Sequence, residues 1–311
     1  MTIEILQPYK LLPDCAAALE KQFTVHKLFE AEDKAAFLKE VGPRIRGLAA
    51  SGKIDAAMIA ALPALEIIAN IGVGYDSIDV AAAKARNIRV TNTPDVLNDA
   101  VAELTVGMML ALSRRIPQAD RFVREGRWAR GESFPFSVEL TGRTLGILGL
   151  GRIGKEIASR AQGLRMRVVY SGRNKQEKEP YSYYADLEEM ARDCDWLVVI
   201  APGGKATEGI VSRRVLEALG PQGMLVNMAR GSVVDQEALV ELLQSGGLGG
   251  AALDVFVNEP NVPEALLAMD NVLLSPHVAS ATQQTRDAMG ALMAKNLVAH
   301  FKGDPLPSAV V

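Results

Sequence analysis

The stretch Thr144–Ala158, "TLGILGLGRIGKEIA", decides the fold of this chain. An apolar run ends in glycines and is followed by helix-forming residues, which predicts a strand, a tight turn and the start of a helix. Gly149, Gly151 and Gly154 match G-x-G-x-x-G in that context, a pattern typical of turns that bind the pyrophosphate of a dinucleotide. The helix N-terminus would add unpaired N–H groups and a favourable dipole. A plain tight turn between a strand and a helix would show the same glycines.

A second phosphate-binding pattern overlaps this stretch. Gly149 to Lys155 also satisfies G-x-x-x-x-G-K. That pattern requires Ser or Thr at the next position to hold Mg²⁺, and Glu156 stands there instead. Because a carboxylate would repel a triphosphate, we reject an ATPase.

Apolar runs alternate with helical patterns along the whole chain. Five runs precede residue 95, at residues 2–8, 25–29, 45–51, 65–72 and 88–94, and five follow the glycine motif, at 166–172, 195–202, 223–230, 249–256 and 271–277. With the strand of the motif itself, this predicts two arrays of five and six strands. Such alternation is typical of α/β folds with parallel sheets and crossover helices.

Two helical segments link the arrays. Residues 97–116 predict one long apolar helix that is buried on most sides, and residues 282–301 predict a last helix that returns the chain to the first array. The tail 302–311 is expected to be a Pro-broken extension. The sequence therefore predicts two Rossmann-like domains: a discontinuous substrate domain of residues 1–98 and 285–311, and a dinucleotide-binding domain of residues 99–284 inserted into it.

Composition excludes several other classes of protein. The chain has 311 residues, 49% of them hydrophobic and 23% charged, with a net charge of −3 and no basic cluster, so we expect no nucleic-acid partner. Its apolar stretches are too short or interrupted to span a bilayer, and its first ten residues do not predict a signal peptide. Because the chain has only three histidines, we expect no His-rich metal site. Cys15 and Cys194 have no metal or disulfide spacing, and we expect buried thiols in a cytoplasmic protein.

The end of the strand after the glycine motif carries no acidic residue. In an NAD-binding fold, an Asp or Glu near that point accepts hydrogen bonds from the ribose hydroxyls. Here the strand ends in Ser171, Gly172, Arg173 and Asn174, followed by Lys175. Cations at this place favour the 2′-phosphate of NADP(H), with NAD(H) as the weaker alternative. A solvated loop that happens to be basic would look the same.

Three later strand ends carry distinctive side chains. Arg230 follows one strand and precedes a glycine, Glu259 stands three residues after Phe256, and His277 follows Ser-Pro. Singly, each has an ordinary structural explanation. Together they stand at the strand ends where α/β proteins bind ligands. There Arg230 can bind a carboxylate through its planar guanidinium, His277 can donate a proton, and the carboxylate of Glu259 would favour the charged imidazole.

The first array contains a comparable turn. Residues 70–79, "NIGVGYDSID", place a Gly-x-Gly turn after a strand, and the backbone N–H groups near Val73 and Gly74 are suited to an anion. A plain turn between strand and helix is equally compatible with that spacing.

These motifs together resemble one family. The stretches "NIGVGYDSID", "GLGRIGKEIA", "YSGRN", "NMARGSVVDQEAL", "ALDVFVNEP" and "PHVASAT" are similar to those of the D-isomer-specific 2-hydroxyacid dehydrogenases, over essentially the whole chain. The resemblance is strongest to NADPH-dependent glyoxylate and hydroxypyruvate reductases, which include the hydroxyphenylpyruvate reductases. It implies a substrate cleft between two Rossmann-like domains, and a homodimer formed through the helix near 97–116 and the segment after it. Trp128 or Phe134 of the partner would be candidates to line the substrate pocket.

The resemblance also assigns residue roles. Arg230, Glu259 and His277 become catalytic, and Val73 and Gly74 bind the substrate carboxylate together with Arg230 and His277. Asp254 would contact the nicotinamide carboxamide. The cofactor-binding residues implied are Gly149, Gly151, Arg152, Ile153, Gly154, Ser171, Arg173, Asn174, Ala201, Pro202, Thr207, Ala229, Asp254 and Ala279. The implied reaction is NADPH-dependent reduction of a small 2-oxo acid, with no metal.

Three relatives remain for comparison. A phosphoglycerate dehydrogenase would usually carry the ribose-binding acid and often a regulatory C-terminal domain. A formate dehydrogenase has Gln where Glu259 stands, so we reject that function for this chain. A nicotinamide-sensing corepressor keeps the catalytic trio but has a long partner-binding tail. A phosphoglycerate dehydrogenase-like enzyme and a corepressor-type binding protein stay as the alternatives.

Overall fold

The structure, a computed structural model, describes residues 2–311. The chain divides into two compact units. One contains the residues up to Leu97 together with Ser280–Val311, and the other contains Asn98–Ala279. The second unit is therefore inserted into the first.

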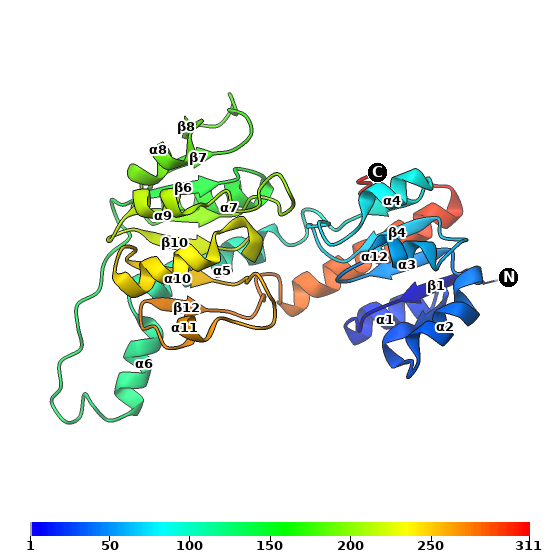
Figure 1. Cartoon of the computed structure of the whole chain (residues 1–311), viewed down its shortest axis with the longest axis horizontal. Helices are drawn as coiled ribbons and strands as arrows, with labels where there is room; N and C mark the ends of the chain where they lie inside the picture. Colours follow the sequence, from blue (N-terminus) through cyan, green and yellow to red (C-terminus); the bar gives the residue numbers. More distant parts are fainter. Residues whose placement is uncertain (1) are drawn as a thin grey trace. The chain divides into compact units, whose positions relative to one another are not determined.

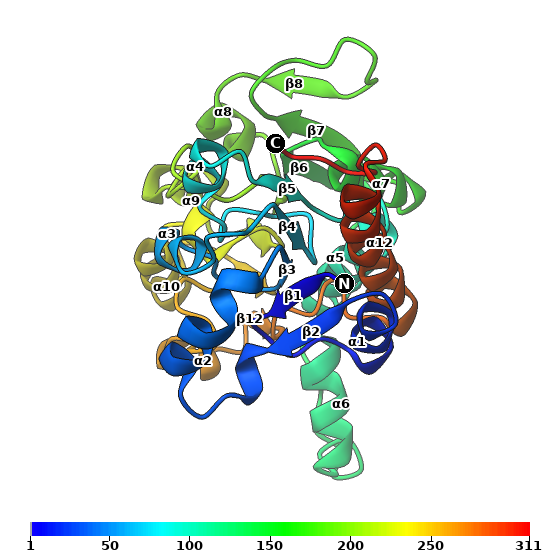
Figure 2. The same cartoon turned by 90° about the vertical axis from the view of Figure 1, so that its right-hand side faces the viewer.

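The first unit is built on a parallel sheet of five strands. Its elements are β1 (Glu4–Gln7), α1 (Pro13–Glu20), β2 (Thr24–Lys27), η1 (Leu28–Glu30), α2 (Lys34–Val41), η2 (Gly42–Arg44), β3 (Gly47–Ala50), α3 (Ala56–Ala60), β4 (Ile67–Asn70), α4 (Val80–Ala85), β5 (Arg89–Thr91) and α12 (Gln283–Lys302). The strand order is β2-β1-β3-β4-β5. Helices α1 and α12 cover one face of this sheet, and α2, α3 and α4 cover the other (Figure 2).

The second unit is built on a parallel sheet of seven strands (Figure 1). Its elements are α5 (Asn98–Ser113), α6 (Ile116–Arg124), β6 (Thr144–Leu148), α7 (Arg152–Gly163), β7 (Arg167–Ser171), β8 (Ser182–Tyr184), α8 (Leu187–Arg192), β9 (Trp196–Val199), α9 (Arg213–Leu219), β10 (Met224–Asn227), η3 (Gly231–Val233), α10 (Gln236–Ser245), β11 (Gly250–Leu253), α11 (Glu264–Leu267) and β12 (Val272–Leu274). The strand order is β12-β11-β10-β9-β6-β7-β8. From β6 the chain adds strands on one side as far as β8 and then returns to β9 on the other side, so the order of connection reverses between β6 and β9, although all strands are parallel. In open sheets of this kind, that reversal point is where ligands bind.

The central strands are apolar because helices cover both faces of each sheet. Every residue of β3, β4, β6, β9 and β11 is buried. A strand buried on both faces is read in sequence as a continuous apolar run rather than an alternating one. The two parallel sheets confirm the fold class predicted from the runs.

One strand of the second sheet was not predicted. Six strands were predicted for this array, whereas the structure has seven, because β8 pairs with β7 at the edge of the sheet. Its sequence is Ser-Tyr-Tyr, and its side chains are half-buried or exposed. An edge strand of three residues after a charged loop has too little apolar character to give a periodic signal.

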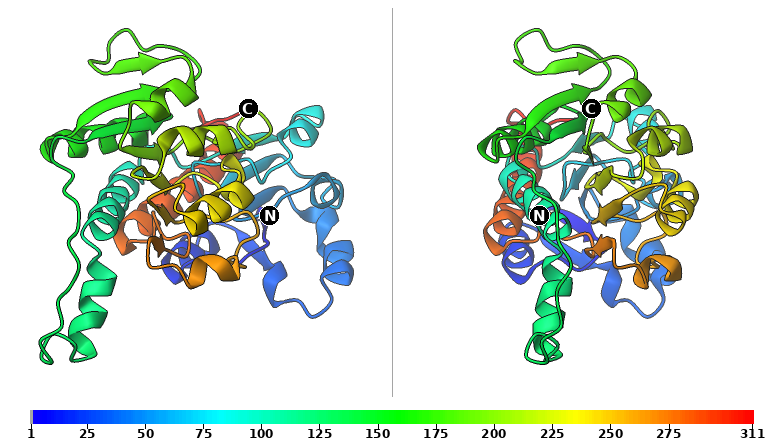
Figure 3. Two further views of the ribbon diagram at one scale, coloured as in Figure 1. Left: turned by 60° about the vertical axis from the view of Figure 1, so that its left-hand side comes forward. Right: turned by 90° about the vertical axis from the view of Figure 1, so that its left-hand side faces the viewer.

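The predicted helix at 97–116 ends early. Helix α5 stops at Ser113, and Arg115 adopts a left-handed backbone conformation with φ of 53°. Pro117 then lies in the first turn of the separate helix α6. A left-handed residue breaks the run of helical hydrogen bonds, so the apolar pattern continued past the point where the backbone turns. Figure 3 shows α6 and the irregular segment after it projecting from the rest of the second unit.

The C-terminal tail is more ordered than predicted. Ala309 pairs with Thr91 in an antiparallel bridge, and Val310 donates its backbone N–H to the carbonyl of Val90 at 2.7 Å. Val310 and Val311 pack against the core of the first unit. The tail therefore adds an antiparallel edge to an otherwise parallel sheet. Within residues 2–311, no helix is both long and apolar enough to cross a bilayer.

Both cysteines are free and buried, as predicted. Burial raises the pKa of Cys15 to about 11 and that of Cys194 to about 12, so both thiols stay protonated at neutral pH. Each packs against a glycine. A Cβ at Gly290 would lie 2.8 Å from Sγ of Cys15, and a Cβ at Gly146 would lie 2.5 Å from Sγ of Cys194. The thiols thus fill space that glycine leaves in the core.

Gly146→Ala should destabilise the protein by about 1–3 kcal/mol, because the added methyl overlaps Sγ of Cys194 in a closely packed core. Adding Cys194→Ala to this variant should recover most of the loss, because it removes the overlapping atom. Denaturant unfolding measures both effects. Gly163→Ala is the control, since a Cβ there meets no atom within 4 Å. Strictly additive losses in the double variant would contradict the packing explanation.

Candidate active site

The glycine turn after β6 is dictated by close packing. Gly149 has φ of 103°, and a Cβ on it would lie 2.9 Å from the backbone nitrogen of Ala201. A Cβ on Gly154 would lie 2.3 Å from the carbonyl oxygen of Gly149. By contrast, a Cβ on Gly151 would meet no atom of the chain within 4 Å. Gly149 and Gly154 therefore shape the turn, while Gly151 leaves open space beside its backbone.

The N-terminus of α7 borders this open space. Helix α7 starts after Gly151, which has no side chain to cap the first N–H groups. In the same unit, Asp186 and Asp235 cap α8 and α10 with their carboxylates. Uncapped N–H groups and the helix dipole make the start of α7 suited to a pyrophosphate. Arg152 and Ile153 form the first turn of this helix.

The end of β7 lies beside the glycine turn. The carbonyl of Ser171 accepts the backbone N–H of Gly149 at 2.9 Å. Ser171 is buried, whereas Arg173 and Asn174 are exposed. A Cβ on Gly172 would meet nothing within 4 Å. The end of this strand therefore presents polar and cationic groups, and no carboxylate stands at residues 171–175.

The strand on the other side of β6 contributes a second loop. Ala201 and Pro202 follow β9, and the Oγ1 hydroxyl of Thr207 closes the loop by donating to the carbonyl of Pro202 at 2.6 Å. Ala201 is buried against the glycine turn. The loops after β6 and β9 thus meet at the reversal point of the sheet.

Arg230 follows β10 in a tightly held loop. The side chain of Asn227 accepts the backbone N–H of Ala229 at 3.1 Å and donates to the carbonyl of Arg230 at 3.0 Å. Nη1 of Arg230 donates to the carbonyl of Ala229 at 2.7 Å. A Cβ on the next residue, Gly231, would lie 2.0 Å from the carbonyl carbon of Phe256. The loops after β10 and β11 therefore touch backbone to backbone.

Asp254 joins the ends of β11 and β12. It is 1% exposed, and its two carboxylate oxygens accept the backbone N–H groups of Val278 and Ala279, each at 3.0 Å. His277 immediately precedes them and has a left-handed backbone with φ of 54°. Such a conformation costs about 1–3 kcal/mol outside glycine and persists where the surroundings enforce it. Asp254 supplies that enforcement.

His277 and Glu259 form a hydrogen-bonded pair. Nδ1 of His277 lies 2.8 Å from Oε2 of Glu259. The other oxygen, Oε1, accepts the backbone N–H of Phe256 at 3.0 Å, which fixes the carboxylate. The two side chains are 47% and 34% exposed, so the pair is open to a ligand. Because Glu259 occupies Nδ1, Nε2 is the ring nitrogen that can exchange a proton with a bound molecule.

The turn at Val73 and Gly74 lies in the first unit. Asn70, which is 3% exposed, donates to the carbonyls of Gly72 at 3.2 Å and Gly74 at 2.9 Å. Asn92 donates to the carbonyl of Val73 at 2.9 Å. In a trans peptide the N–H points away from the C=O. With the carbonyls of Gly72 and Val73 held by these amides, the N–H groups of Val73 and Gly74 point the other way.

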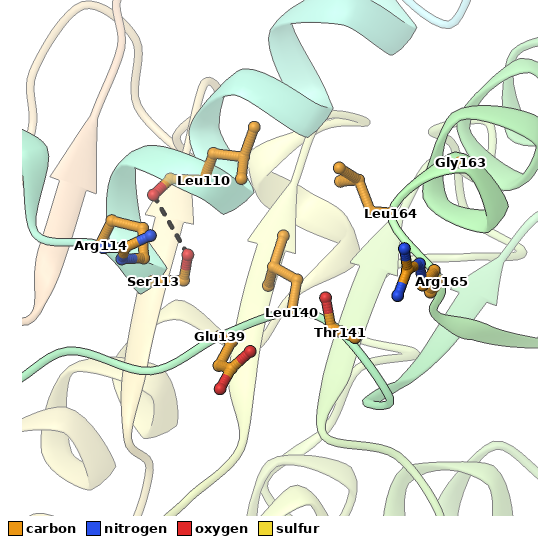
Figure 4. A pocket seen from close by; sticks show the side chains of 9 residues that line it. All are labelled: Leu110, Ser113, Arg114, Glu139, Leu140, Thr141, Gly163, Leu164 and Arg165. Carbon is orange, nitrogen blue, oxygen red and sulfur yellow. Dashed lines mark hydrogen bonds between the residues drawn. The ribbon is translucent and has the colours of Figure 1, made fainter.

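A groove of about 430 Å³ lies at the amino ends of the strands of the second sheet (Figure 4). Its lining includes Arg114 near the end of α5, Leu140 before β6 and Arg165 before β7. These positions are at the amino ends of the strands, whereas the glycine turn and His277 are at the carboxyl ends. The groove is therefore distinct from the candidate site.

The second unit brings most of the predicted site residues to one sheet edge. Arg230, Glu259 and His277 follow β10, β11 and β12, which are neighbours in the sheet. Val73 and Gly74 stand in the other unit. The sequence did not reveal the tasks of Asn70, Asn92 and Asn227, because a lone Asn gives no signal until its partners are known. Among the described residues, no group of three or more His, Cys, Asp and Glu is suited to hold a metal.

Comparisons with known proteins identify the family. The family model for the "D-isomer specific 2-hydroxyacid dehydrogenase, NAD binding domain" matches residues 106–279. The chain belongs to this family. It is 44% identical over 295 residues to a glyoxylate/hydroxypyruvate reductase of Arabidopsis thaliana, a match that covers 94% of each protein. It is 43% identical over 295 residues to the hydroxyphenylpyruvate reductase of Plectranthus scutellarioides, again with 94% of each covered.

A solved structure is also similar over the whole chain. The NADPH-dependent glyoxylate/hydroxypyruvate reductase of Sinorhizobium meliloti, in complex with NADP and malonate, is 46% identical with a TM-score of 0.96. The match covers 100% of this chain and 97% of that one. The protein is an NAD(P)-dependent 2-hydroxyacid dehydrogenase, as the motifs predicted.

Asp254→Asn should release the loop that carries His277. The amide group would present N–H to a backbone N–H, so one buried hydrogen bond is lost and a donor is left unpaired, at a cost of about 1–3 kcal/mol. We expect faster hydrogen exchange at Val278 and Ala279 and a turnover number lowered by about tenfold or more. Asp235→Asn is the matched control, because Asn caps a helix as well as Asp does. Unchanged exchange at both amides would contradict this role.

Proposed function

We propose that this enzyme reduces a small 2-oxo acid, of the glyoxylate or hydroxypyruvate type, to the D-2-hydroxy acid with NADPH. The observation that carries the proposal is the 2.8 Å contact between His277 and Glu259, in the same unit as the glycine turn. A proton donor held by a carboxylate at the edge of a dinucleotide-type sheet suits reduction of a carbonyl. The names of the relatives in Arabidopsis and Sinorhizobium support this substrate class.

The residues of the chain divide the reaction between them. A bound reduced nicotinamide supplies the hydride. Arg230 offers a planar fork to the substrate carboxylate, and in the first unit the outward N–H groups of Val73 and Gly74 are proposed donors to the same kind of group. Nε2 of His277 donates a proton to the oxygen of the substrate, where negative charge develops. Glu259 accepts the Nδ1 proton and so fixes the orientation of the ring, which leaves Nε2 as the proton donor.

The open space beside Gly151 and the uncapped start of α7 fit a pyrophosphate. The other proposed cofactor contacts rest on the family resemblance and on their positions at neighbouring strand ends: they are Arg152, Ile153, Ser171, Asn174, Ala201, Pro202, Thr207, Ala229, Asp254 and Ala279. Although Asp254 binds two backbone N–H groups, each of its oxygens keeps a second acceptor position for the nicotinamide carboxamide.

We also propose a homodimer formed through α6 and the segment after it. Ile116, Val123, Trp128 and Phe136 are 52%, 55%, 71% and 103% exposed, which leaves large apolar side chains in water. Phe134 packs against Phe122 of the same chain, so Trp128 is the better candidate to reach a partner's site. Apolar groups exposed together on a projecting segment favour association. Sedimentation equilibrium tests this state, and a monomer at micromolar concentration would contradict it.

A panel of substrates tests the proposed activity. Oxidation of NADPH should be measured with glyoxylate, hydroxypyruvate, pyruvate, phenylpyruvate and 2-ketogluconate. We expect the highest kcat/KM with glyoxylate or hydroxypyruvate. Turnover of none of the five would reject the proposed reaction and favour a binding protein.

Arg230→Lys should raise KM for the 2-oxo acid by about tenfold or more, which corresponds to about 1.4 kcal/mol. An ammonium is a point charge and does not reproduce the two parallel hydrogen bonds of a guanidinium. Arg143→Lys is the control, since Arg143 pairs with Asp195 at the opposite sheet edge. Steady-state kinetics measures both variants. A KM within twofold of wild type would assign carboxylate binding to other groups.

The wild type should prefer NADPH over NADH by about 10- to 1000-fold, which corresponds to about 1.4–4.2 kcal/mol and is the size expected for one or two charge-assisted contacts to the 2′-phosphate. Arg173→Ala should weaken NADPH binding and leave NADH nearly unchanged. Gly172→Asp should shift the preference toward NADH, because the space beside Gly172 admits the side chain. Equal affinity of the wild type for both cofactors at low salt, where screening is least, would refute this preference.

A further inference from the structure

The connection between β7 and β8, residues 172–181, is fastened to the rest of the second unit at several points. Figure 2 draws it as an extended loop that reaches β8 at the edge of the sheet. Arg173 and Asn174 stand near its start and are exposed. In residues 2–311, no hydrogen bond or ion pair engages the guanidinium of Arg173. The loop thus carries a cation that is available to a ligand.

Two tyrosines fix the start of this connection. Tyr170 in β7 is 1% exposed, and its ring packs against that of Tyr183 in β8 with centroids 5.3 Å apart. The hydroxyl of Tyr183 donates to the carbonyl of Gly172 at 3.1 Å. The peptide that precedes Arg173 is therefore held from the neighbouring strand.

Gln176 fixes the connection four residues later. Its backbone N–H donates to the hydroxyl of Tyr170 at 2.7 Å. Its side-chain Nε2 donates to the carbonyl of Leu150 at 2.6 Å. Leu150 lies between Gly149 and Gly151, in the turn suited to a pyrophosphate. Gln176 consequently joins the loop that carries Arg173 to the glycine turn.

Two more contacts hold the rest of the loop along α7. Lys155 pairs with Glu179 at 2.7 Å, and the hydroxyl of Tyr181 donates to Oε1 of Gln162 at 3.0 Å. Glu179 and Tyr181 follow Gln176 in the sequence, so these contacts hold the later part of the loop on the helix and do not involve the segment that contains Arg173. The span from Gly172 to Gln176 is the part whose two ends are both fixed next to the glycine turn.

We propose that Gln176 is a positioning residue that sets the preference for a 2′-phosphorylated cofactor. It holds the span 172–176 in one arrangement, so that Arg173 and Asn174 are in place before the cofactor binds. A contact made by groups that are already ordered gives more affinity than one that must order them. This inference rests on the proposed use of NADPH.

The predicted effect is selective. A cofactor without the 2′-phosphate gains nothing from Arg173 and Asn174, so loosening the span should weaken NADPH and largely spare NADH. The bond from Gln176 to Leu150 also steadies the glycine turn, which serves both cofactors, so a small loss for NADH is expected as well.

Dissociation constants of NADPH and NADH, measured by fluorescence titration, test the proposal. Gln176→Leu keeps the approximate size of the side chain but removes its hydrogen-bond donor. It should raise the dissociation constant of NADPH by about tenfold and that of NADH by less than threefold. Tyr170→Phe removes only the acceptor for the Gln176 N–H and should change the ratio in the same direction. Gln222→Leu, in an exposed turn before β10, is the matched control and should change neither constant. The turnover number with saturating NADPH should stay near that of the wild type.

The outcomes separate this inference from the proposed function. If the wild type binds both cofactors equally, the proposed NADPH preference fails and this inference fails with it. If the wild type prefers NADPH and Arg173→Ala abolishes the preference, but Gln176→Leu keeps it, only the role of Gln176 is overturned. Equal weakening of both cofactors in Gln176→Leu would also overturn it, because the residue would then act on the turn alone.

Discussion

The buried carboxylate of Asp254 is the constraint on which the candidate site depends. By accepting the N–H groups of Val278 and Ala279 it ties the end of β12 to the end of β11, and it holds His277 in a left-handed conformation. Glu259 leaves the same β11 loop and meets the ring of His277. The approach of Gly231 to Phe256 then fixes the loop of Arg230 against these two. Three strand ends are thereby locked into one rigid edge, which is what a preorganised catalytic site requires.

In both units, the proposed anion site is formed by backbone N–H groups. In the second unit, packing forces glycines after β6, and the uncapped start of α7 lies beside them. In the first unit, Asn70 and Asn92 bind the carbonyls of Gly72 and Val73 in the turn after β4, so the N–H groups of these peptides point away from the two amides. Side-chain amides bind carbonyls in both turns: Asn70 and Asn92 do so in the first unit, and Gln176 binds the carbonyl of Leu150 in the second. The proposed donors to the anion are backbone N–H groups rather than charged side chains. Such donors suit a pyrophosphate in one unit and a carboxylate in the other.

Much of this structure could be predicted from the sequence, because buried parallel strands are continuous apolar runs and glycine motifs have fixed spacing. The predictions were wrong where the structure of a segment is not determined by the periodicity of its own apolar residues. Strand β8 is stabilised by pairing at an edge rather than by its own apolar residues, and α5 ends at the backbone conformation of Arg115, which no periodic pattern encodes. The contact of Gln176 with Leu150 joins residues 26 positions apart through a side-chain amide. Only the folded chain brings such partners together.

The central claim is that His277, held by Glu259, protonates the substrate. The turnover number for NADPH-linked reduction of hydroxypyruvate tests it most directly, in the wild type and in His277→Ala. Removal of the general acid should lower kcat by about 10²-fold or more, while the dissociation constant of NADPH stays nearly unchanged. A kcat near that of the wild type would contradict the account.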